Sequence, residues 1–120
     1  NEKYRKDPAI AHDIIWIIPT SQANTVLRTK IVQKAFPGLD KQSDLFLDQI
    51  GHPKPPLVTL NVYLHYATIY GKSPVGLPIP STLTKTNNPK FDAELNKRLQ
   101  ELAWETVTNY SYSGVKAPYP

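Results

Sequence analysis

The chain has 120 residues, enough for one modest domain with a single hydrophobic core. Hydrophobic residues make up 40% of the chain and charged residues 20%, as is ordinary for a globular domain. The net charge of +4 comes from scattered lysines and arginines. They form no basic stripe with interleaved aromatic residues, so we expect no nucleic-acid partner.

The sequence also lacks the residues that several kinds of site require. There is no cysteine, hence no disulfide or thiolate metal site, and the histidines and carboxylates show no metal-ligand spacing. The glycines are isolated, so no phosphate-binding loop is present, and we expect neither cofactor nor metal. No apolar run approaches the ~18 residues of a membrane span. The chain begins with Asn1 and contains no methionine, which favours a processed or truncated product.

Residues 1–12 are polar and interrupted by proline, which predicts an arm. The apolar run 14-IIWII-18, ended by Pro19, predicts a strand buried on both faces. Such a strand needs other strands beside it, and the chain offers no second comparable run. We therefore expect an α/β domain whose sheet is completed by a companion polypeptide. The alternative is a helical bundle in which residues 14–18 are a short buried element.

Three helices are predicted after this run. The first covers residues 20–35 and ends at 36-FPG-38, with a face formed by Ala23, Val26, Leu27, Ile31 and Val32. The second covers residues 57–71 and is apolar almost all round, although its β-branched residues leave a strand as an alternative. The third follows the turn-rich residues 72–89, with Asn88 as a cap before Pro89. Its apolar residues have a period near 3.6, and an irregular tail follows.

The candidate chemistry lies in 44-DLFLDQIGHPKPP-56. His52 stands between Gly51 and Pro53 in a loop, and an imidazole suits general base catalysis when a carboxylate such as Asp48 orients it. The alternative is that both residues only cap a helix end. Ser21 lacks the glycines of a nucleophile elbow, and a helix cap explains it sufficiently. His65 is expected to be a hydrogen-bonded histidine of the core or of an interface.

The segments 14-IIWIIPTSQA-23, 36-FPGL-39, 44-DLFLDQIGH-52 and 63-YLHYATIYGKSPVGLP-78 together resemble the C-terminal half of SGNH/GDSL-type hydrolases, particularly bacterial SGNH-like proteins. The resemblance implies a flavodoxin-like three-layer α/β/α fold. It also implies a serine esterase mechanism with His52 as the base and Asp48 as its orienting carboxylate. The serine and the oxyanion donors of the family lie in earlier sequence blocks, which implies a companion polypeptide that carries them.

These expectations divide the chain into an arm (residues 1–12), the C-terminal part of an SGNH-like domain (13–78), and a linker with an amphipathic helix and tail (79–120). The expected function is the Asp/His half of a split ester hydrolase, acting on an ester such as an acetylated carbohydrate only as part of an assembly. A non-catalytic subunit and an independent helical binding module are the alternatives. The compartment stays open, with a secreted or periplasmic location slightly favoured.

Overall fold

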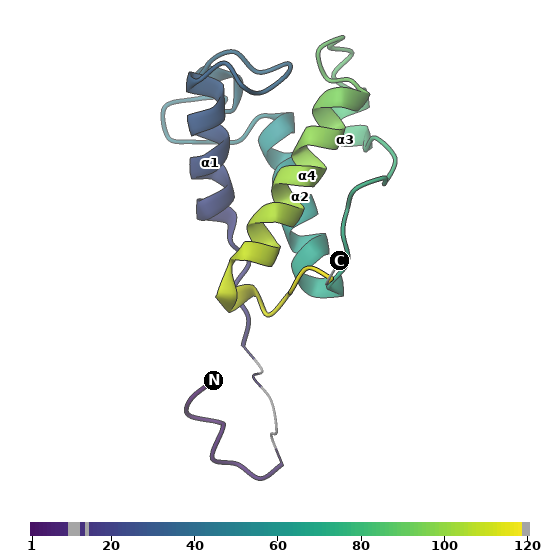
Figure 1. Cartoon of the computed structure of the whole chain (residues 1–120). Coiled ribbons are helices and arrows are strands. Elements are labelled where there is room, and N and C mark those ends of the chain that lie inside the picture. The colour runs from purple at the N-terminus through teal and green to yellow at the C-terminus, as the bar shows by residue number, and fades with distance from the viewer. Residues whose placement is uncertain (10–12, 14, 119–120) are drawn as a thin grey trace.

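In a computed structural model, which describes residues 1–9, 13 and 15–118, the chain is helical (Figure 1). Two single turns of 3₁₀ helix, η1 (Gln42–Asp44) and η2 (Ser111–Ser113), lie in the connections. The α-helices of the described residues are α1 (Thr20–Val32), α2 (Pro55–Tyr70), α3 (Ser81–Thr84) and α4 (Ala93–Asn109). In the same part of the chain there is no strand, and one antiparallel bridge joins Phe46 to Pro53.

The expected flavodoxin-like α/β/α fold is therefore wrong, and so is the strand at residues 14–18. Ile14 lies outside the described residues, and residues 15–19 have no regular secondary structure. The backbone of Ile15 bonds to the side chain of Asn1, and the N–H of Ile17 donates to the carbonyl of Tyr112. A doubly buried strand requires neighbouring strands, and none exists in the described ranges to hold this run in a sheet. The bundle alternative is the one observed, but Ile15 and Ile17 are exposed rather than buried in it.

The helix predicted over residues 57–71 is confirmed as α2, and its boundaries have local causes. Pro55 and Pro56 occupy the first turn, where a missing N–H costs nothing. Gly71 ends the helix in the left-handed conformation. The alternative of a strand here is excluded.

The third predicted helix is also confirmed, as α4, but it begins later than the expected cap at Asn88. The carboxylate of Asp92 is the actual N-cap and accepts the N–H of Leu95 at 3.0 Å. Asn88 instead closes a turn, since its side chain accepts the N–H of Lys90 at 3.0 Å. The leucines with a helical period in α4 are buried as predicted.

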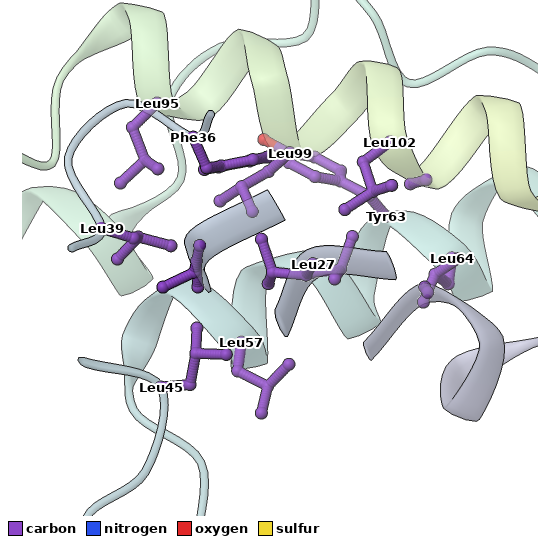
Figure 2. Close-up of a cluster of buried hydrophobic side chains, with 14 of the residues drawn as sticks. Leu27, Phe36, Leu39, Leu45, Leu57, Tyr63, Leu64, Leu95, Leu99 and Leu102 are labelled. Atoms are coloured by element: carbon purple, nitrogen blue, oxygen red, sulfur yellow. The ribbon is translucent and has the colours of Figure 1, made fainter. Parts of the chain in front are cut away.

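The core lies between the three long helices, with α4 packed along α2 and α1 packed against both (Figures 1 and 2). Val26 and Val32, predicted on the inner face of α1, are exposed instead. The fully buried aliphatic side chains at the centre of the core include Leu27, Ile31, Leu60, Leu64, Leu95, Leu99 and Val107.

Hydrogen bonds join α2, and the segment that follows it, to α4. The hydroxyl of Tyr63 donates to Oδ1 of Asn96 at 2.7 Å, and Nε2 of Gln100 donates to the carbonyl of Leu77 at 2.9 Å. Burial raises the pKa of Tyr63, so its phenol stays protonated and can donate. In the described part of the chain, no helix combines the length and hydropathy needed to cross a membrane.

Candidate functional site

The segment that carries Asp48 and His52 is a closed loop between η1 and α2. Its two ends pair in antiparallel fashion: the N–H of Leu47 donates to the carbonyl of His52 at 2.8 Å, and the N–H of Lys54 donates to the carbonyl of Leu45 at 2.8 Å. Leu45 is fully buried in the core. The loop is therefore tied at its base to the packed part of the molecule.

The aspartate organises the turn inside this loop. Oδ1 of Asp48 accepts the backbone N–H of Ile50 at 3.1 Å and that of His52 at 3.2 Å, which is an Asx-type turn. Gly51 has φ +90°, a conformation that residues with a Cβ rarely adopt. The turn at Gly51 reverses the chain and returns His52 to the aspartate.

The two candidate residues are brought together. Nδ1 of His52 is bonded to Oδ2 of Asp48. This is the contact that the sequence analysis expected for a carboxylate that orients an imidazole. Nε2 of His52 has no hydrogen-bond partner within residues 1–9, 13 and 15–118, and the His52 side chain is 63% exposed. When Nδ1 carries the proton and donates to the carboxylate, Nε2 has a free lone pair and can accept a proton from a reactant.

The carboxylate is held in its ionised form. The hydrogen bond from the His52 side chain, followed by the backbone N–H groups of His52, Ile50 and Gly51, lowers the pKa of Asp48 below its ordinary value. Asp48 is consequently negative at neutral pH, as a residue that orients an imidazole and stabilises its protonated form has to be.

A second aspartate, which the sequence did not single out, closes the turn at η1 just before the loop. Burial acts to raise the pKa of Asp44, but backbone N–H bonds from Asp40 and Lys41 outweigh it, and the pKa is lowered. Oδ2 of Asp44 accepts these bonds at 2.9 and 3.1 Å. Lys41 is not a usual helix-cap residue, so the sequence carried no clear signal for this contact.

A groove of about 470 Å³ opens beside the loop. Leu47, the backbone partner of His52, forms part of its wall, and Phe91 and Asn88 come from the segment before α4. Lys54 and Lys90 add cationic groups to the same wall. The groove thus combines an aromatic ring, an amide and charged side chains, which suits a polar organic molecule with several hydrogen-bonding groups.

The other sequence candidates are not part of this arrangement. Ser21 is the second residue of α1, which starts after Pro19, so it is not the helix cap that the sequence indicated. No serine or threonine hydroxyl bonds to His52 among the residues that the structure describes. His65 is exposed on α2 rather than in the core, with Nδ1 at 2.7 Å from the carbonyl oxygen of Asn61. The described residues contain no cluster of three or more His, Cys, Asp or Glu side chains that could hold a metal ion.

No protein-family model matches this chain, and comparison with curated proteins and with solved structures finds no match either.

Proposed function

We propose that Asp48 and His52 are the acid–base half of a serine hydrolase that cleaves esters, of the SGNH type that the sequence resembles. In this proposal a companion polypeptide contributes the nucleophilic serine. The observation that carries the proposal is the pairing of His52 Nδ1 with an ionised Asp48, with Nε2 left open to an incoming reactant. This chemistry does not depend on the three-layer fold, because the same pair serves hydrolases of unrelated folds.

The chemical role of each group follows from this geometry. The serine hydroxyl transfers its proton to Nε2 of His52 while its oxygen attacks the ester carbonyl. Asp48 stabilises the imidazolium, which then gives the proton to the departing alcohol as the carbon–oxygen bond breaks. Water repeats the sequence on the acyl-serine, with His52 again as the base, and releases the acid. Asp48 stays ionised throughout.

The surroundings of the pair favour a polar leaving group. An acetylated carbohydrate is a suitable substrate class, since the groove beside Leu47 offers the ring of Phe91 and the amide of Asn88. An aromatic face next to amide and charged groups can bind the apolar face and the hydroxyl groups of a sugar together. His52 is exposed enough to be reached by an ester attached to a larger molecule.

The test is His52→Ala in the assembled protein, assayed with short acyl esters such as 4-nitrophenyl acetate. General acid–base catalysis contributes roughly 10²- to 10⁴-fold, and a loss of that size in kcat/KM is expected. Tyr112→Ala is the control, because it removes an exposed aromatic side chain of η2 that lies outside the loop and the groove. Unchanged turnover in His52→Ala would remove this residue from the mechanism.

A second candidate function is a non-catalytic subunit, in which the pair only stabilises its own loop. One observation favours it: Oδ1 of Asp48 bonds to the backbone of Ile50 and of His52, so the aspartate has a structural task without any chemistry. Labelling of the assembly with a serine-directed phosphonate distinguishes the two functions. A non-catalytic subunit leaves every companion chain unlabelled.

A further inference from the structure

Helix α2 has two apolar faces, and only one of them is covered. Its sixteen residues include no aspartate, glutamate, lysine or arginine. One face packs into the core through residues that include Leu57, Leu60, Leu64 and Ala67. The opposite face, which we call the outer stripe, consists of Val58, Val62, His65 and Ile69.

The residues of the outer stripe follow each other at intervals of four, three and four, which places them along one side of a helix. Val62 is 53% exposed and Ile69 is 66% exposed. His65 is the only ionisable group of the stripe. A helix that is apolar all round is normally buried on every side, so the outer stripe indicates a surface that another molecule covers.

Two further exposed apolar side chains lie in the loop of the candidate site. Ile50, inside the Asp48–His52 loop, is 82% exposed, and Leu47 at the base of the loop is exposed as well. His52 precedes Val58 by six residues, so the two Cα atoms are at most ~20 Å apart. A protein interface covers ~800 Å² on each partner, which is wide enough to reach the stripe and His52 together.

The composition of the stripe favours a protein over a lipid surface or a second copy. Helices that bind membrane interfaces carry lysine and arginine beside their apolar face, and α2 has neither. The net charge of +4 on each copy opposes self-association. A different protein with an uncharged aliphatic surface needs no lysine or arginine on α2 to bind Val62 and Ile69. It also avoids the repulsion between two copies of this basic chain.

We propose that the outer stripe of α2 is the docking surface for the polypeptide that carries the nucleophilic serine. The proposal rests on the proposed function, because it takes the missing hydroxyl to be supplied from outside the chain. One docked polypeptide then covers the exposed stripe and brings its serine to Nε2 of His52. Its contact surface is aliphatic and uncharged.

The absence of cysteine from the chain permits a direct test. Val62→Cys and, as a control, Val32→Cys on the exposed side of α1 are each coupled to a thiol-reactive benzophenone. Each tagged chain is added to an extract of cells that produce the protein, illuminated, and treated with a fluorescent serine-directed phosphonate. The expected product is a crosslink between position 62 and a phosphonate-labelled polypeptide, at least roughly tenfold stronger than from position 32. Adding Ile69→Asp should abolish it.

Loss of docking and loss of chemistry give different results. With His52→Ala added, the crosslink from position 62 should persist while the phosphonate label disappears. A labelled polypeptide that copurifies but crosslinks equally from both positions would overturn the docking surface and leave the proposed function standing. A polypeptide crosslinked from position 62 that is never labelled, with His52 present, would overturn both. Crosslinking to a second copy, or cosedimentation with phosphatidylcholine–phosphatidylserine vesicles that Ile69→Asp abolishes, would identify a different occupant and overturn the proposal.

Discussion

Asp48 holds His52 at two points, through its side chain and through its backbone. Oδ2 of the aspartate is bonded to Nδ1 of the imidazole, and Oδ1 accepts the backbone N–H of His52 at 3.2 Å. The aspartate therefore fixes both the position of the residue and the direction of its ring. The backbone contact needs one accepting oxygen at position 48, and the imidazole contact needs a second acceptor for the proton on Nδ1. A substitution that keeps only the first oxygen therefore separates the two contacts.

Asp48→Asn is expected to keep the turn and lose the catalytic base. The asparagine carbonyl still accepts the N–H groups of Ile50 and His52, but its NH₂ group donates toward Nδ1 and thereby stabilises the tautomer with the proton on Nε2. We expect kcat/KM on short acyl esters to fall by roughly 10²- to 10⁴-fold in the assembled protein. The far-UV circular dichroism should not change. Asp13→Asn, at a carboxylate that pairs with Arg5 outside the loop and the groove, is the control and should retain full turnover.

The loop is expected to lose its aspartate contacts in acid, at a pH below the ordinary pKa of the carboxyl group. The pKa of Asp48 in the folded chain is lowered from 3.8, so its stabilising contribution is present above 3.8 and is lost as the pH falls through the lower, folded value. NMR titration of the Ile50 and His52 amide protons should show a transition with a midpoint below 3.8. The transition should be absent in Asp48→Asn. A midpoint above 3.8 would contradict the assigned contacts.

The helices were predictable because their signals are local. The apolar period of residues 93–107 and the stop at Gly71 depend on neighbours within the same helix, and both match the structure. The start of α4 was predicted too early, since Asn88 and Asp92 are both acceptable caps and only the contact from Asp92 to Leu95 decides between them. A local pattern also cannot show whether partner strands exist, which is why the run 14-IIWII-18 indicated a strand.

The candidate site was predictable only as a pair of residue types. The spacing of Asp48 and His52 allows a turn to join them but does not require one. The contacts that close the loop run between backbone groups of Leu45, Leu47, His52 and Lys54, and backbone contacts leave no residue-specific signal. The open side of α2 was visible as an apolar helix without charges, but which of its faces is covered depends on the tertiary packing against α4.

Gly114→Ala is expected to destabilise the chain more than Gly76→Ala. Both glycines have positive φ, 73° and 94°, so alanine is strained at either position. A Cβ at Gly114 would also lie 2.5 Å from Cε3 of Trp16, whereas a Cβ at Gly76 meets nothing within 4 Å. The additional overpacking should lower the free energy of unfolding by about 1–3 kcal/mol relative to Gly76→Ala, measured by urea denaturation. Equal stabilities would show that the Trp16 ring does not pack on the tail.

Tyr63→Phe is expected to weaken the core through a hydrogen bond rather than through packing. The phenylalanine ring fills the same space, but Oδ1 of the buried Asn96 loses its donor at 2.7 Å and Gln100 loses one of its two acceptors. An unpaired buried acceptor costs about 1–3 kcal/mol, so the free energy of unfolding in urea should fall by about that amount. Tyr70→Phe removes a hydroxyl from an exposed tyrosine of the same helix and should change the stability by less than ~0.5 kcal/mol.

If both variants unfold at the same urea concentration, the Tyr63 hydroxyl contributes nothing to the core. If Tyr63→Phe alone is destabilised, the bonds of Tyr63 to α4 stabilise the inner face of α2, the face opposite the outer stripe.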